Sequence, residues 1–284
     1  MRRCNSILIV VLCLFGFISL AAAKGKCDMR VASFNLRQNN PGDGDDAWPK
    51  RAKAVAQFVR FHDFDIFGTQ EGFKSMLDDI IEGGGYAYTG KGRDDGKDGG
   101  EHSAIIYKTD RFQLLDSGDF WYAEKSDVPG KGWDAVCCNR ICSWGKFKDK
   151  ISGKMFYFFN SHFDHQGVVA RRESSKLLLS KIKAIAGNMP VLCTGDFNAT
   201  PESEPIKIIL ADGLLKDSRA ISEKTPYGPE GTFQDFQFSS PMKMRIDYIF
   251  VTKSIRILKY GVLTDTLYGH FMSDHCPAMA DVEF

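Results

Sequence analysis

Apolar residues recur along this chain with two different spacings, and segments of the two kinds alternate. Runs in which apolar residues are consecutive or alternate with polar ones predict β-strands. They occupy residues 30–36, 65–69, 103–107, 143–147, 155–161, 191–194, 244–251, 255–262 and 278–284. Spacings of three and four, as between Val55 and Val59, predict helices over 52–59, 73–81, 171–186 and 203–210. Strands outnumber helices, which favours an α+β or layered α/β fold.

The first 23 residues have the pattern of a signal peptide. Arg2 and Arg3 precede an apolar run over residues 7–20, and three alanines follow at 21–23, where a signal peptidase would cleave. The run is too short for the about 20 residues that a membrane-spanning helix needs, and no later segment is long and apolar enough. We therefore expect export to the periplasm or the extracellular space. Residues 24–284 are expected to form one domain, because no linker or repeat interrupts them.

The charge of the chain is nearly balanced, with 37 basic and 36 acidic residues. Non-specific binding to duplex nucleic acid depends on a basic surface. The balance therefore argues against a general DNA-binding module, although it leaves a nuclease possible, because a metal ion or a local patch can supply positive charge.

Six of the eight cysteines follow the predicted signal peptide. Cys137, Cys138 and Cys142 lie close together, and Cys27 is a further candidate partner, so export permits a disulfide among these four. The pairing is left open. Cys193 and Cys276 lie in apolar stretches and are expected to be buried in the core. No CxxC pair or adjacent histidine completes a zinc site, which argues against a zinc hydrolase.

Polar residues with catalytic potential lie at the ends of the predicted strands. They are Asn35, Glu71, His162, Asp164, Asp196, Asn198, Asp247, Asp274 and His275. Rigid strands can deliver such side chains to one shared edge. Carboxylates are ligands for hard divalent cations, and hydrolysis of a phosphate ester needs a base for water and a Lewis acid for the phosphoryl oxygens. The set therefore predicts phosphate-ester hydrolysis.

Each of these residues alone has a structural interpretation. A single aspartate after a strand more often caps a turn, and Glu71 could cap the helix that follows it. Residues 198–200 also form a glycosylation sequon. The functional interpretation depends on the joint occurrence of the residues in one order.

That order resembles the endonuclease/exonuclease/phosphatase family, which includes DNase I, AP endonucleases, secreted sphingomyelinases, inositol polyphosphate 5-phosphatases and CCR4-type deadenylases. The resemblance covers nearly the whole of residues 24–284. It is carried by Ser33-Phe34-Asn35, Thr69-Gln70-Glu71, Asn160-Ser161-His162-Phe163-Asp164, Thr194-Gly195-Asp196-Phe197-Asn198, Arg245-Ile246-Asp247-Tyr248 and Ser273-Asp274-His275-Cys276-Pro277. It implies an α+β fold of four α/β/β/α layers, in which two packed mixed β-sheets are flanked by helices.

The resemblance also implies a divalent cation, Mg²⁺ or Mn²⁺, held by Glu71 with Asn35 beside it and Asp274 on the metal side. His275 is then similar to the general base that activates water, oriented by Asp247.

Further roles follow from the same resemblance. Asp196 and Asn198 would position the nucleophile and the phosphate, and His162 would contact the phosphate or the leaving group. Glu101 is similar to the carboxylate that pairs with that histidine in DNase-like members. Arg140 is similar to the arginine that contacts phosphate.

The chain departs from the AP endonuclease pattern at Arg37, where those enzymes carry an aspartate, so one metal ion is expected rather than two. Phe233, Phe236 and Phe238 could stack on a base or an apolar headgroup, or pack in the core. We expect a monomeric, exported phosphoesterase whose substrate is a nucleic acid, a phospholipid headgroup or an inositol phosphate, with nuclease action slightly favoured. A non-catalytic binding protein on the same scaffold is the remote alternative, because such members should lose the histidines or Glu71.

Overall fold

The computed structural model describes residues 28–284 and contains two six-stranded β-sheets packed face to face. In the first sheet the strand order is β11 (Arg256–Val262), β14 (Ala278–Glu283), β1 (Asp28–Asn35), β2 (Ile66–Gln70), β4 (Ile105–Lys108) and β3 (Tyr86–Thr89). In the second it is β5 (Phe112–Trp121), β6 (Ile141–Asp149), β7 (Met155–His162), β8 (Val191–Asp196), β10 (Asp247–Thr252) and β9 (Leu215–Asp217). Both sheets are mixed, because β1 pairs with β2 and β7 with β8 in parallel among antiparallel neighbours.

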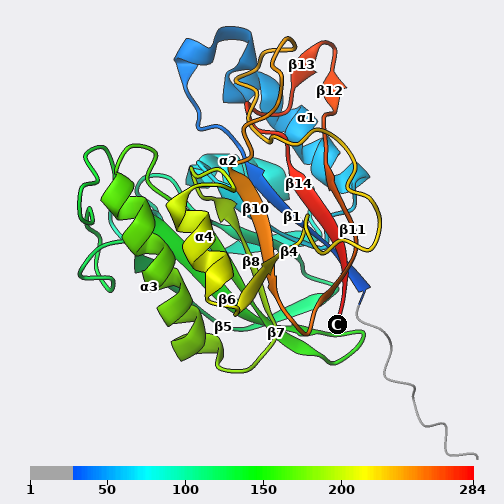
Figure 1. Ribbon diagram of the computed structural model, residues 1–284. Helices are drawn as coiled ribbons and strands as arrows, with labels where there is room; N and C mark the ends of the chain where they lie inside the picture. The colour runs from blue at the N-terminus through cyan, green and yellow to red at the C-terminus, as the bar shows by residue number, and fades with distance from the viewer. Residues whose placement is uncertain (1–27) are drawn as a thin grey trace, which may run out of the picture.

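Helices cover the outer face of each sheet (Figure 1). Helices α1 (Trp48–Phe61) and α2 (Lys74–Ile81) pack on the first sheet, and α3 (Val168–Ala186) and α4 (Glu204–Ala211) pack on the second. A short 3-10 segment, η1 (Pro41–Asp46), and a hairpin of β12 (Thr266–Leu267) and β13 (His270–Phe271) complete the described elements. The predicted four-layer α/β/β/α sandwich is confirmed.

Alternating side chains of the central strands serve two different hydrophobic cores. In β1, Met29 and Val31 pack between the sheets, whereas Ala32 and Phe34 pack against the helices. Successive side chains of a strand point to opposite faces, so a strand covered on both faces must be apolar at nearly every position. This explains why the central strands are continuous apolar runs in the sequence.

Several elements differ from the sequence-based expectation. Strand β5 was not predicted, because Asp116, Ser117 and Asp119 interrupt its apolar pattern and are typical of a turn. The strand lies at the edge of its sheet and has a register shift between Leu114 and Asp116, so its polar side chains need no buried partners. The glycine- and aspartate-rich segment Pro41–Asp46, for which apolar periodicity predicts no element, forms the 3-10 segment η1.

The structure contains one of the disulfide pairings that the sequence leaves open. Cys142 is a free, buried thiol, and Cys137 and Cys138 form a disulfide with each other. Cys142 is packed in the core between β6 and the helices, which explains why it is not a disulfide partner. Cys193 and Cys276 are buried free thiols, as expected. Cys27 and the predicted signal peptide lie outside the described residues, and no helix among residues 28–284 is long and apolar enough to cross a membrane.

A buried polar network joins the two sheets just below the strand ends. The Asn160 amide nitrogen on β7 donates to the backbone oxygens of Thr69 (2.7 Å) and Ala104 (2.9 Å) in the opposite sheet. The Asn160 oxygen accepts hydrogen bonds from Gln70 (2.7 Å) and Thr194 (2.9 Å). All of the polar capacity of the Asn160 amide is thus used, which fixes the two sheets relative to each other.

Replacing Gly68 by alanine is expected to destabilise the fold by about 2–3 kcal/mol. A Cβ atom at Gly68 would lie 2.2 Å from both Asn160 Oδ1 and Thr194 Oγ1, so the network between the sheets would have to break. Urea unfolding of the variant measures this loss. Gly130→Ala is the matched control, because a Cβ atom there meets nothing within 4 Å; equal stability of the two variants would show that the network contributes little.

Candidate active site

The strand register brings the chemically active residues to one edge of the sandwich. In the second sheet Asp196, at the end of β8, lies opposite His162 on β7 and opposite Asp247 on β10. In the first sheet Asn35 ends β1 and Glu71 directly follows β2, which runs parallel to β1. The segment before β14 contributes Asp274 and His275. The two sheets therefore present their polar ends to the same cavity.

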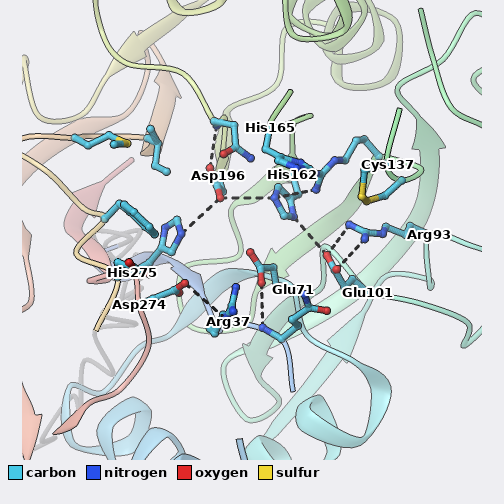
Figure 2. A pocket seen from close by; sticks show the side chains of 18 residues that line it. Arg37, Glu71, Arg93, Glu101, Cys137, His162, His165, Asp196, Asp274 and His275 are labelled. Carbon is cyan, nitrogen blue, oxygen red and sulfur yellow. Dashed lines mark hydrogen bonds and ion pairs between the residues drawn. A yellow bond between two sulfur atoms is a disulfide. The ribbon is translucent and has the colours of Figure 1, made fainter. Parts of the chain in front are cut away.

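This cavity has a volume of about 580 Å³. Figure 2 shows the side chains that line it, and the hydrogen bonds and ion pairs between them. The lining residues are Arg37, Gln38, Glu71, Arg93, Glu101, Cys137, Cys138, Arg140, His162, His165, Asp196, Asn198, Phe233, Asp235, Met244, Ile246, Asp274 and His275. Charged and polar side chains predominate among them.

Glu71 is held in a defined orientation by its neighbours. Its backbone has a φ of 62°, and its carboxylate accepts hydrogen bonds from the Asn35 amide (3.0 Å) and the Gln38 backbone N–H (3.0 Å). Burial alone would raise the pKa of Glu71, but the nearby His275 and these two donors lower it below its ordinary value. The group is therefore an anionic carboxylate turned into the cavity.

His275 forms a buried pair with Asp247, whose Oδ2 lies 2.8 Å from Nδ1 of the imidazole. Burial alone would lower the pKa of His275, but Asp247 and the nearby carboxylates of Asp274 and Asp196 raise it well above its ordinary value. The pair fixes the proton on Nδ1 and turns Nε2 into the cavity. The ring of Phe233 packs against the imidazole, with 5.0 Å between the ring centres.

Asp196 lies between the two histidines of the site. Its Oδ2 is 4.0 Å from His275 Nε2 and 3.6 Å from His162 Nε2, and it accepts a hydrogen bond from the Asn35 amide (3.0 Å). Its Oδ1 accepts a hydrogen bond from the backbone N–H of Asn198 (2.9 Å). Burial and the charge of Asp247 raise the pKa of Asp196 to about 7.

The other end of the cavity is formed by His162, Arg140 and an ion pair between Arg93 and Glu101. Arg140 donates to His162 Nε2 (3.0 Å) and to His165 Nδ1 (2.7 Å). Burial and the charges of Arg140 and Arg93 lower the pKa of His162 well below its ordinary value. His162 is therefore neutral, and its Nδ1–H faces Glu101 Oε2 at 3.8 Å.

Glu101 forms a bidentate pair with the guanidinium of Arg93, at 2.6 and 2.7 Å. Burial raises the pKa of Glu101 to about 7 in spite of this partner. A carboxyl group with such a pKa can hold or release a proton near neutral pH.

The residues present fit a divalent cation. Ligand atoms of Glu71, Asp196 and His275 lie within 4.8 Å of one another. Asp274 and Asp247 add two further buried carboxyl groups, and Asp247 Oδ1 has no hydrogen-bond partner. Burial raises the pKa of Asp274 as well as that of Asp196, and a bound cation would favour the anionic form of both carboxyl groups. Oxygen-rich donor sets of this kind suit Mg²⁺ or Mn²⁺.

The structure brings all of the predicted site residues except Asp164 together. Eight of them line the cavity, while Asn35 and Asp247 lie directly behind it and orient the lining carboxylates and His275. Their individual roles remain predictions. Asp164 is placed differently: its Oδ1 accepts hydrogen bonds from the backbone N–H groups of Gln166 and Gly167 before α3, and its Oδ2 lies 3.4 Å from Arg140.

Some lining residues were not predicted from the sequence. Arg93 lies in a loop rich in glycine and aspartate, and no pattern in that loop indicates its pairing with Glu101. His165 lies three positions after His162, and this proximity in the sequence could have indicated that it lies near the site. Of the three clustered phenylalanines only Phe233 lines the cavity; Phe238 stacks on Phe271 with ring centres 4.6 Å apart.

Comparison with known proteins agrees with this geometry. A model of the endonuclease/exonuclease/phosphatase family matches residues 32–275. A solved structure of a family member from Bacteroides thetaiotaomicron is 46% identical, with a TM-score of 0.88, and the match covers 92% of this chain and 99% of that one. A mannosyl-6-phosphatase from Bacteroides thetaiotaomicron VPI-5482 is also 46% identical, with a TM-score of 0.86 and coverage of 90% and 100%.

More distant curated relatives match part of their own length. Nocturnin of Drosophila melanogaster is 24% identical over 69% of this chain, which corresponds to 33% of that protein. This chain spans 33% to 48% of the length of the three curated relatives that it matches. The family model and the two Bacteroides structures nevertheless cover most of the chain, and the protein therefore belongs to the endonuclease/exonuclease/phosphatase family.

Proposed function

We propose that this protein is a divalent-metal-dependent phosphomonoesterase that removes a terminal phosphate from a sugar. The observation that carries the proposal is the 46% identity to the mannosyl-6-phosphatase over 90% of this chain and the whole of that one. The cavity supports it, because its carboxylate cluster and its cationic groups lie side by side within one volume of about 580 Å³.

This proposal changes the order of preference reached from the sequence, in which nuclease action was slightly ahead. A phosphomonoester carries more negative charge at its phosphate than a diester does. The guanidinium of Arg140 lines the cavity beside His162 and Arg93 and offers paired N–H donors to such a dianion. The near-balance of charge over the whole chain also gives no support to binding of long nucleic acids.

Water activation is assigned to the end of the cavity at His275. The 4.0 Å between His275 Nε2 and Asp196 Oδ2 is too long for a hydrogen bond, but it fits a water molecule that bonds to both atoms. Asp247 holds the proton on Nδ1, so Nε2 is the atom that can take a proton from this water, in the form of the enzyme in which Nε2 has lost its own proton. The Asn198 backbone N–H and the Asn35 amide keep Asp196 in place while the proton moves.

The phosphate is assigned to the space between Asp196 and Arg140, because attack in line requires the leaving oxygen to lie opposite the water. His162 and Glu101 then lie on the leaving-group side. A proton held at Glu101, whose pKa burial raises to about 7, would be available to the departing alkoxide oxygen. Glu71, with Asn35 and Asp274 nearby, would hold the cation, which when bound would supply positive charge to the phosphoryl oxygens.

The experiment that tests the proposal compares a monoester and a diester with the same sugar. Purified protein is given mannose 6-phosphate or its 6-phosphate methyl diester, each with Mg²⁺, with Mn²⁺ or with EDTA. We expect release of inorganic phosphate from the monoester alone, and only with metal. Faster hydrolysis of the diester, of plasmid DNA or of an inositol polyphosphate would replace the proposal with the corresponding alternative.

Replacing Arg140 by methionine is expected to lower kcat/KM for the phosphomonoester by about a hundredfold. The variant loses the paired N–H donors that would contact the phosphate, so inhibition by inorganic phosphate should weaken in parallel. Steady-state kinetics measures both effects. Arg172→Met serves as the control, because Arg172 pairs with Glu173 on α3 outside the cavity; similar losses in the two variants would mean that Arg140 has no special role at the phosphate.

A further inference from the structure

The disulfide between Cys137 and Cys138 lies in the wall of the catalytic cavity. Both residues line it, and Cys137 is exposed while Cys138 is half-buried. In Figure 2 the Cys137 side chain lies on the side of His162 and Arg93, away from His275. The disulfide lies just before Arg140 in the sequence, and Arg140 directly precedes β6.

The contacts along the cavity define its two ends. Asp196 Oδ2 lies 4.0 Å from His275 Nε2 on one side and 3.6 Å from His162 Nε2 on the other. From His162, Glu101 is 3.8 Å away, and Arg93 is bound to Glu101. With water activated at His275, the departing group must leave in the direction of His162 and Glu101. The disulfide lies at that end.

The apolar lining of the cavity falls into two separate groups. Phe233, Met244 and Ile246 belong to the His275 end: Phe233 packs on the imidazole, and its backbone N–H bonds to the oxygen of Met244. At the opposite end the lining residues are Arg93, Glu101, Arg140, His162, His165 and the two cysteines. Within the described lining, the disulfide is thus the apolar surface available to a group that leaves on the His162 side.

We propose that the Cys137–Cys138 disulfide is the specificity-determining wall of the leaving-group subsite, where it packs against the C–H face of the sugar from which the phosphate is cleaved. This inference rests on the proposed function. Arg93, Glu101 and His165 surround the same space with polar groups that can bond to the sugar hydroxyls. A pocket that combines apolar surface with a few fixed polar groups is typical of a site for a small molecule, and here the polar groups could bond to the hydroxyls of a sugar.

A disulfide suits this position better than two thiols. Sulfur is soft and polarisable, and the bond removes both S–H donors, which leaves a purely apolar contact. The bond between adjacent residues also restricts the local chain, which is held further by the hydrogen bond from the Asn139 amide to the Arg93 oxygen (3.2 Å). A wall that is rigid before the sugar binds costs less entropy on binding.

The test compares a bulky and a small leaving group in the Cys137→Ser/Cys138→Ser double variant. The substrates are mannose 6-phosphate and acetyl phosphate, whose leaving group has no ring. We expect kcat/KM for the sugar phosphate to fall about tenfold, while that for acetyl phosphate changes by less than about twofold. The inhibition constant of inorganic phosphate should stay unchanged, because the phosphate position is intact.

Two further measurements distinguish loss of the disulfide from a general disturbance of the cavity. Mild reduction of the wild-type protein should produce the same selective loss, because Cys142, Cys193 and Cys276 are already free thiols. Met244→Ala changes the apolar lining at the opposite end of the cavity and should leave the ratio of the two substrates unchanged.

The outcomes separate this inference from the proposed function. Equal losses for both substrates, or weaker inhibition by phosphate, would assign the disulfide to the support of Arg140 and overturn the inference alone. A larger effect of Met244→Ala on the sugar phosphate would place the sugar at the His275 end and also overturn it. If the wild-type protein does not hydrolyse mannose 6-phosphate at all, the proposed function fails and this inference fails with it.

Discussion

Replacing His275 by alanine is expected to lower kcat about a thousandfold, while the variant remains folded. His275 is the imidazole that Asp247 orients, and its Nε2 faces the water position beside Asp196. The substitution removes the proton acceptor, and the buried carboxylate of Asp247 loses its hydrogen-bond partner. Stopped assays of phosphate release measure the loss of turnover, and circular dichroism with thermal unfolding confirms that the fold is retained.

Two companion variants make the result specific. Asp247→Asn keeps the ring but weakens its orientation, so a smaller loss of kcat is expected than for His275→Ala. His270→Ala is the matched histidine control, because His270 is exposed and contacts Asp46 on η1 rather than a cavity residue. Turnover near the wild-type level in His275→Ala would exclude His275 as the base and leave Asp196, with its pKa near 7, as the group that accepts the proton.

Replacing Glu71 by glutamine is expected to raise the metal concentration needed for half-maximal activity by at least about a hundredfold. The substitution removes the negative charge of Glu71, the carboxylate expected to hold the cation, but preserves the size of the side chain. It should also remove the stabilisation by metal, which for the wild-type protein is about 2.7 kcal/mol when the metal is present at a hundred times its dissociation constant.

Thermal unfolding with Mn²⁺ or EDTA provides a readout that does not depend on activity. Wild-type protein should gain stability with Mn²⁺, and Glu71→Gln should not. Glu82→Gln is the control, since Glu82 is an exposed residue at the end of α2. An unchanged metal titration in Glu71→Gln would show that the cation, if one binds, is held by other groups.

The residues that form the site could be predicted from the sequence because they lie at strand ends. Asn35, Glu71, His162 and Asp196 end or directly follow buried strands, and the pairing of those strands brings their ends to the same edge. Apolar periodicity predicted most of these strands, since their central positions are buried on both faces. The order of the motifs then indicated the family, which the structure and the comparisons confirm.

Other parts of the site could not be predicted, because they depend on contacts between loops. Arg93 and Glu101 meet through a loop whose glycine and aspartate residues have no periodicity. The disulfide between Cys137 and Cys138 was one of several pairings that the four candidate cysteines allowed. Charge in the site is also a collective property: burial raises the pKa of Asp196 and of Glu101 to about 7, and burial follows only from the complete fold.

The polar network between the two sheets could not be predicted from apolar periodicity either. Asn160 and Gln70 lie in strands that are otherwise mostly apolar. Both are buried, and they form a hydrogen bond between the two sheets. A buried amide of this kind specifies how the sheets are aligned, because a shift would leave its donors unpaired. The alignment in turn sets the distance between Glu71 on one sheet and Asp196 on the other.

The most direct test is hydrolysis of mannose 6-phosphate in water enriched in oxygen-18, with Mn²⁺ or EDTA, followed by mass spectrometry of both products. If the site directs water at phosphorus as proposed, each phosphate released with Mn²⁺ carries one labelled oxygen, the mannose carries none, and EDTA stops the release. Labelled mannose, or equal release in EDTA, would contradict metal-dependent attack of water on the phosphate at this site.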